Sequence, residues 1–244
     1  MGELKNPKLA IPVVLMAGIF WSFGPYVVRN IDQAHTVPWQ YLFTRGLVIF
    51  ILLNLYLYLE EGLSFISNYK RIGISGIVGG IGLAFAMITF IWSITNTSAA
   101  ITLLCLASMP FITALLGFLF LKETISINVW VAIGIAALGI IIMAIGNSEK
   151  NTLIGFVLGM VSAVGFSIFS VSLRWKKETP KFTTVALAGL ICFLVSLMVI
   201  AYKDLSLVSS SKNQSLFALH GTIVCLGMIL YAIASKNIQA AELT

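Results

Sequence analysis

Residues 72 to 121 form a stretch of fifty positions (121 − 72 + 1) that contains no charged side chain. A helix needs about 20 apolar residues to cross the hydrocarbon core of a bilayer. The stretch is therefore too long for a single span. The polar sequence TNTS at 95–98 divides it into 72–94 and 99–121. We predict two antiparallel transmembrane helices joined by a short polar turn.

The composition places the whole chain in the same class. Of its 244 residues, 59% are hydrophobic and 10% are charged, against about 25% charged residues in a typical soluble domain. The net charge of +6 lies in short clusters between apolar runs, which is typical of membrane loops and does not indicate nucleic-acid binding. The three cysteines lie inside apolar runs without CxxC spacing, so we expect no disulfide framework and no metal site.

The apolar runs predict an all-α integral membrane protein, a polytopic helix bundle with eight spans and the start of a ninth. The spans cover residues 9–28, 39–59, 72–94, 99–121, 127–146, 153–173, 182–202 and 213–235, and the ninth begins at 238–244. Of the fifteen Lys and Arg residues, ten fall in loops on the side of the N-terminus and four on the other side, and Arg45 lies within a span. This asymmetry predicts a cytoplasmic N-terminus in the cell (inner or plasma) membrane.

The two parts of the chain match each other at two nearly equal offsets. At an offset of 141 the matched pairs are Gly80 with Gly221, Met87 with Met228, and Phe90 with Tyr231. At an offset of 145 they are Trp21 with Phe166, Ser22 with Ser167, and Arg29 with Arg174. The repeated unit has five spans, an odd number, so its copy must run through the membrane in the opposite sense. We predict inverted repeats over 1–146 and 147–244, an arrangement typical of secondary transporters.

Three segments resemble the EamA family. They are GIFWSFGPYVVRN, YLFTRGLVIFILLNL, and the long segment that begins NTSAAITLLCLASMPF, in which the family pattern is matched by Pro110, Glu123, Ser126, Gly134 and Gly139. The resemblance implies the drug/metabolite transporter superfamily, with ten helices in two inverted five-helix repeats, alternating access and small metabolites as substrates. Against that pattern the second repeat is incomplete. The tail YAIASKNIQAAELT is interpreted as the end of the eighth span and the first turns of a ninth helix, which predicts a truncated chain.

Two ionisable residues inside the predicted spans are candidates for substrate binding. Arg45 lies about 9 Å inward from Trp39 by helical rise. It is expected either to meet an anionic or carboxylate-bearing substrate or to reach outer phosphates or Asp32. His220 is expected either to relay protons or bind substrate, or to form a hydrogen bond with a neighbouring helix. The sequence leaves both alternatives open.

Trp21, Ser22 and Tyr26 are further cavity candidates on the first span. Ser22 and Tyr26 are one helical turn apart, and an aromatic wall with a hydroxyl group suits an organic ligand. The alternative for Trp21 is a structural position or a position facing lipid. Pro25 and Pro110 remove backbone hydrogen bonds inside spans and are candidates for helix kinks and gating. Glu123 matches the family motif and is expected to have a structural role at a loop.

These observations predict a multi-pass transporter that moves a small organic metabolite, amino-acid-like or related, by alternating access. No enzyme activity, catalytic residue, cofactor or metal is expected. Both aspartates, Asp32 and Asp204, lie in predicted loops, and the two histidines, His35 and His220, lie in different parts of the chain, so the sequence shows no metal-ligand cluster. A non-transporting membrane scaffold and an intramembrane enzyme are the alternatives. The expected partners are the lipid bilayer and a small-molecule substrate, with a homodimer as an open alternative and nucleic acid excluded.

Overall fold

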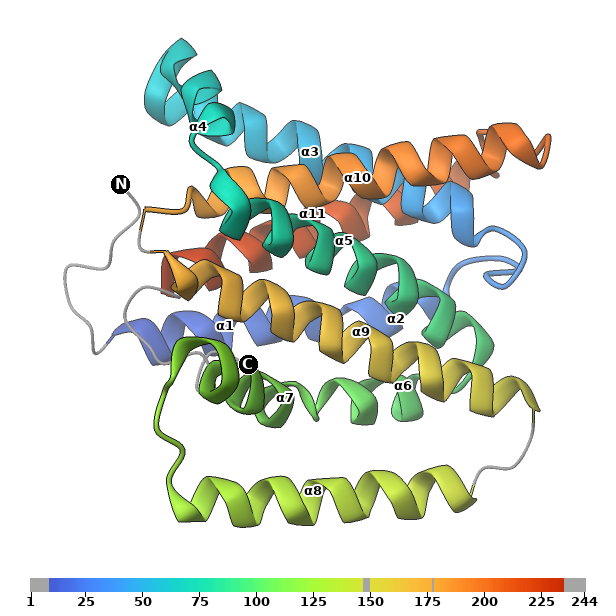
Figure 1. The fold of residues 1–244 in the computed structure, drawn as a ribbon. Helices are drawn as coiled ribbons and strands as arrows, with labels where there is room; N and C mark the ends of the chain where they lie inside the picture. Colours follow the sequence, from blue (N-terminus) through green and yellow to red (C-terminus); the bar gives the residue numbers. More distant parts are fainter. Residues whose placement is uncertain (1–8, 147–149, 177, 235–244) are drawn as a thin grey trace.

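The computed structural model describes residues 9–146, 150–176 and 178–234, and every regular element in these ranges is a helix (Figure 1). In chain order they are α1 (Ala10–Ser22), α2 (Gly24–Arg29), α3 (Pro38–Glu61), η2 (Gly62–Phe65), α4 (Ile66–Lys70), α5 (Gly73–Asn96), α6 (Ala99–Leu106), α7 (Met109–Leu116), η3 (Gly117–Leu121), α8 (Ile127–Gly146), α9 (Lys150–Trp175), α10 (Lys181–Tyr202) and α11 (Ser211–Ala234). The all-helical fold class is confirmed. The predicted start of a ninth span at 238–244 lies outside the described residues.

Long apolar sequences become helices here because a helix satisfies its backbone hydrogen bonds within one segment, which lipid requires. Among the described residues, seven helical segments are long and apolar enough to cross a membrane. The predicted fifth span, 127–146, coincides with α8, and the part of α8 whose side chains are described, Ile127–Gly139, is a shorter apolar helix. A membrane-embedded multi-pass protein is therefore confirmed, and the count of eight spans stays a prediction.

Two of the predicted spans are broken near a proline. The first is divided into α1 and α2 at Phe23, and Pro25 lies in the first turn of α2. The fourth is divided into α6 and α7, with Pro110 in the first turn of α7. Proline is tolerated in a first helical turn because its missing N–H group has no intrahelical partner there. Each helix break therefore lies within a few residues of the proline that indicated it.

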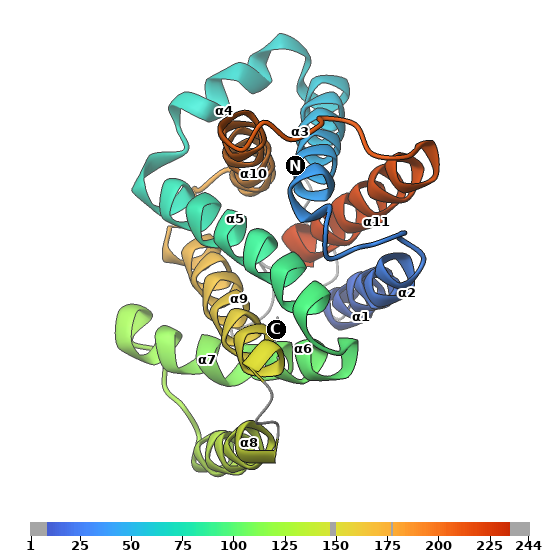
Figure 2. The ribbon, with the colours of Figure 1, turned by 90° about the vertical axis from the view of Figure 1, so that its right-hand side faces the viewer.

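Glycines bring α5 and α9 together at the centre of the bundle (Figure 2). A methyl group added at Gly82 would lie 2.9 Å from the carbonyl oxygen of Gly165, and one added at Gly165 would lie 2.7 Å from the carbonyl oxygen of Gly82. Such distances are too short for a real Cβ atom, so the two backbones need glycine at both positions. The glycines of α5 therefore allow close helix packing, as small residues do at other membrane helix interfaces.

A second glycine contact joins α3 to α10. A methyl group added at Gly46 would lie 2.8 Å from the carbonyl oxygen of Gly189 and 2.7 Å from the amide nitrogen of Phe193. The other extensive helix contacts are those of α1 with α11, α11 with α3, and α10 with α5. α8 lies at the edge of the bundle, where it contacts α7 (Figures 1 and 2). α1, α3, α5, α9 and α11 each contribute residues to the lining of one cavity.

Candidate functional site

The core helices surround a cavity of about 340 Å³. Its volume is at the lower end of the range of about 300–1,000 Å³ that is usual for small-molecule sites. It is lined by Gly18, Trp21, Ser22, Arg45, Leu83, Ala86, Met87, Phe90, Leu103, Leu106, Ala107, Met109, Phe166, His220, Val224 and Met228. These residues come from α1, α3, α5, α6, α9 and α11, from the turn between α6 and α7, and from the start of α7. The lining is mostly apolar, with polar groups at one end.

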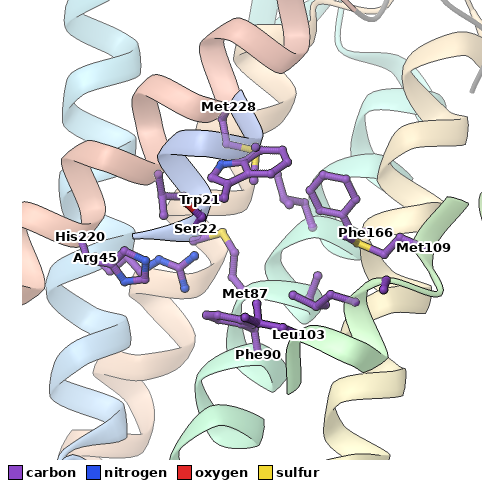
Figure 3. Close-up of a pocket in the computed structure, with 16 residues that line it drawn as sticks. Trp21, Ser22, Arg45, Met87, Phe90, Leu103, Met109, Phe166, His220 and Met228 are labelled. Atoms are coloured by element: carbon purple, nitrogen blue, oxygen red, sulfur yellow. The ribbon is translucent and has the colours of Figure 1, made fainter. Parts of the chain in front are cut away.

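Arg45 supplies the formal charge among the lining residues. Only 5% of its surface is exposed, and its Nε and Nη1 atoms have no hydrogen-bond partner among the described residues. The guanidinium carbon lies 5.9 Å from the centroid of the Phe90 ring, within the range of a cation–π interaction. Among the described residues the ion-pair partner of Asp32 is Lys212, which donates a hydrogen bond of 2.6 Å to its carboxylate, and Arg45 makes no ion pair with it. Arg45 is thus held inside the cavity, and Figure 3 shows its guanidinium extending toward Ser22 and Met87.

His220 lies beside Arg45 (Figure 3) and is almost fully buried. Its Nδ1 atom is hydrogen-bonded to the hydroxyl of Tyr41 on α3. The Tyr41 ring stacks on Phe217, with ring centroids 4.8 Å apart. This places the imidazole between α11 and α3, where α11 also passes close to Gly24 of α2. A methyl group added at Gly24 would lie 3.0 Å from the His220 Nε2 atom, so the small residue leaves room for the imidazole.

Aromatic rings make up the opposite end of the cavity. The Trp21 ring packs edge-on against Phe166, with centroids 5.4 Å apart, and at a tilt of 41° against Tyr231, with centroids 5.5 Å apart. Tyr231 is buried and its hydroxyl is hydrogen-bonded to that of Ser170. The Trp21 Nε1 atom is buried without a partner among the described residues. Ser22 donates its hydroxyl hydrogen to the carbonyl oxygen of Ile19 at 2.7 Å, so its oxygen retains lone pairs that can accept.

The structure brings four of the five predicted cavity residues together: Trp21, Ser22, Arg45 and His220. Tyr26 does not join them. It follows the break at Phe23, lies on α2, and is 69% exposed. Phe23 donates its N–H to the carbonyl of Phe20, a bond of 3.3 Å that spans only three residues and tightens the turn. The helical phase therefore changes, so the four-residue spacing from Ser22 no longer puts Tyr26 on the same face.

The remaining predicted positions lie away from the cavity lining. Glu123 accepts a hydrogen bond of 3.1 Å from the Arg174 Nε atom at the end of α9, a contact that matches the structural role expected of it. Pro110 follows the lining residue Met109 in sequence, and Pro25 lies three residues after the lining residue Ser22.

Sequence reasoning did not single out the apolar lining residues, although a signal for several of them was present. Met87, Phe90, Phe166 and Met228 line the cavity, and each belongs to a matched pair of the predicted repeat. Apolar side chains are the commonest residues of membrane helices, so composition alone cannot separate a cavity wall from a lipid-facing surface. The matched pairs of the predicted repeat were the one signal that distinguished these cavity residues from other apolar residues.

Comparison with known protein families matches residues 8–145 to the EamA-like transporter family. The match covers more than half of the chain. The chain belongs to the EamA-like transporter family. One curated relative of this EamA-like protein is an uncharacterized transporter of Helicobacter pylori (strain J99 / ATCC 700824), 24% identical over 179 residues. That alignment covers 72% of this chain and 58% of the relative, so the chain spans well under two thirds of the relative's length.

A solved crystal structure has the same fold. It aligns with a TM-score of 0.65 over 96% of this chain and 81% of the solved chain, at 17% sequence identity. At this identity the likeness supports the fold and carries no information about the substrate. The predicted membership of the EamA family is confirmed by the family match, and the multi-pass membrane architecture agrees with it.

Proposed function

We propose that this EamA-like protein moves a small organic metabolite, amino-acid-like or related, across the cytoplasmic membrane by alternating access. The observation that carries the proposal is the cavity itself, which lies between helices of both predicted repeats. α1, α3, α5 and α6 belong to 1–146, whereas α9 and α11 belong to 147–244. A binding site between two repeats, near mid-membrane, is where secondary transporters hold their substrates.

The helix contacts support the inverted repeat that the mechanism needs. If α1 corresponds to α9, and α5 to α11, the contact of α1 with α11 is equivalent to that of α5 with α9, and both are extensive. The contact of α3 with α10 is then equivalent to itself, and it is the place where Gly46 meets Gly189. Rocking of one repeat against the other would turn about this contact and expose the cavity at each end of the bundle in turn.

The experiment is counterflow with the full chain in proteoliposomes. Vesicles loaded with an unlabelled metabolite class should accumulate the labelled member of that class, with saturable kinetics. No exchange with any class would overturn the proposal and favour the non-transporting scaffold. Product formation without movement of label would favour an intramembrane enzyme.

The proposed orientation has its own test. The N-terminus is placed in the cytoplasm, which puts the segment after Lys150 on the outer side. A reporter enzyme that works only on the outer side of the membrane should therefore be active when it is fused there. A reporter that stays cytoplasmic would contradict the orientation without bearing on transport.

A further inference from the structure

Hydrogen-bond donors outnumber acceptors among the polar groups of the cavity. The Nε and Nη1 atoms of Arg45 are buried and have no acceptor among the described residues. Among the described residues, no aspartate or glutamate lines the cavity. An unpaired guanidinium away from water is costly, and in membrane proteins such a charge generally meets a partner. The group that completes this site is therefore an acceptor with negative charge.

The rest of the lining sets the shape of the ligand. Figure 3 shows Arg45 and His220 together at one end, while Phe166 and Met109 lie at the other. Between them, Met87, Phe90 and Leu103 present apolar surface. Thioether and aromatic groups bind apolar bodies well and offer nothing to a strongly hydrated ion. A small inorganic anion would satisfy Arg45 and leave the apolar end unfilled.

We propose that the cavity binds a small apolar monocarboxylate, with its carboxylate on Arg45 and its apolar body between Phe90 and Phe166. A guanidinium can hold a carboxylate through two parallel hydrogen bonds, which fixes the ligand's orientation as well as its charge. The described lining offers no carboxylate to an ammonium group, so the site discriminates against amines and zwitterions. This rests on the proposed function and narrows its substrate class to the relatives of amino acids that lack the amino group.

The test is a matched set of four probes titrated onto the full chain in phosphatidylcholine nanodiscs, whose headgroups carry no net charge. The probes are 3-phenylpropionate, phenylalanine, phenethylamine and 3-phenyl-1-propanol, which share one ring and differ in their charged groups. Quenching of tryptophan fluorescence reports binding, because Trp21 lines the cavity. We expect 3-phenylpropionate to bind roughly 10- to 100-fold more tightly than the other three probes, the range that one or two charge-assisted hydrogen bonds supply.

Variants connect the preference to Arg45. Arg45→Gln should reduce the affinity for 3-phenylpropionate to about that of 3-phenyl-1-propanol and leave the affinity for the alcohol unchanged, which also shows that the variant is folded. Arg45→Lys should keep part of the preference, because it retains the charge and loses the fork. Lys212→Gln is the matched control, because it removes a cation that is exposed and does not line the cavity. It should bind all four probes like the wild type.

Several results would overturn the inference. They are equal affinities across the set, tighter binding of phenethylamine or phenylalanine, unchanged 3-phenylpropionate binding in Arg45→Gln, and displacement of the probe by chloride at equal concentration. If Arg45→Gln does not fold, the order of the four probe affinities for the wild-type protein tests the inference by itself.

Counterflow of labelled 3-phenylpropionate separates this inference from transport. Selective binding without exchange would sustain the inference and remove the proposed function. Saturable exchange of phenylalanine or phenethylamine, without selectivity for the carboxylate, would support the proposed transport and overturn the inference about the carboxylate.

Discussion

The two ends of the helix bundle are held together by different chemistry. At the end where α2 finishes, on the right of Figure 1, Asn213 at the start of α11 clamps the backbone of Asp32. Its side-chain oxygen accepts from the Asp32 N–H at 3.0 Å, and its amide group donates to the Asp32 carbonyl at 3.1 Å. Lys212 adds an ion pair with the Asp32 carboxylate at 2.6 Å. Both members of the ion pair are more than half exposed, whereas Asn213 is buried.

At the opposite end, where α9 finishes, the contacts are made by side chains. Ser75 on α5 and Thr179 in the loop after α9 are buried, and their hydroxyls lie 2.6 Å apart. Arg174 and Glu123 form an ion pair of 3.1 Å that is about a quarter exposed on each side. Because exposed charges are screened and neutral buried groups are not, the first end depends mainly on Asn213, and its ion pair contributes little. The second end depends more on its partly buried ion pair.

The largest effect on stability is expected between the two ends, where α3 and α10 are in contact at Gly46. Gly46→Val should lower the free energy of unfolding by about 3 kcal/mol, because its side chain would collide with the α10 backbone. The measurement is thermal or detergent-induced unfolding followed by tryptophan fluorescence. Gly134→Val on α8 is the control, since no atom lies within 4 Å of a methyl group added there. Equal effects of the two substitutions would show that the crossing is not a close contact.

Asn213→Ala should have the next largest effect and should act on one end only. It leaves the Asp32 N–H and carbonyl without their partner, and about 2 kcal/mol of stability should be lost. Labelling of a cysteine placed at Ser22, with the native cysteines replaced, should become faster from the side of α2 and stay unchanged from the other side. Ser215→Ala, at an exposed position on the same helix, should alter neither quantity. Faster labelling from both sides would contradict the separation of the two ends.

The sequence could predict the helices well because the signals for them are local. The predicted span 72–94 corresponds to α5, Gly73–Asn96, since Lys70 and Arg71 before it and the polar turn after it limit where an apolar helix can lie. The break at Phe23 was indicated by Pro25, but its effect on helical phase was not, and this is why Tyr26 lies outside the cavity. Which side chains face the cavity after a helix break depends on tertiary packing, and a local sequence pattern does not predict it.

The cavity could be predicted only where a side chain is unusual for a membrane helix. Arg45 and His220 are ionisable and Trp21 lies away from a membrane interface, so each was recognisable. Met87 and Phe166 are ordinary residues of a membrane helix, and only the matched positions of the predicted repeat indicated them. The Arg45 Nε and Nη1 atoms lack a hydrogen-bond partner among the described residues. Whether they find one depends on which groups converge from α1, α5 and α11, and no single segment of the sequence contains that information.

A smaller effect is expected from the ion pair at the α9 end. Arg174 makes other contacts, so a single substitution would not isolate the pair. A double-mutant cycle with Glu123→Gln and Arg174→Gln should give a coupling energy of about 1 kcal/mol, the upper range for ion pairs that water still reaches. A coupling energy near zero would mean that the Glu123–Arg174 pair adds nothing measurable to this end, where the hydroxyls of Ser75 and Thr179 also meet. In that case the two ends would both depend on neutral groups.

The smallest effect belongs to Lys212→Gln, which should lower the free energy of unfolding by less than about 0.5 kcal/mol, because the pair with Asp32 is more than half exposed. Salt makes the test sharper. Raising the ionic strength from about 0.1 to 1 M shortens the screening length from about 10 to 3 Å, so the difference between wild type and variant should disappear. The Glu123–Arg174 coupling, measured in the same two buffers, should fall less, because its charges are less exposed. If Lys212→Gln instead destabilised the protein more than Asn213→Ala and did so at both salt concentrations, the α2 end would be held by charge, and the contrast between the two ends would be reversed.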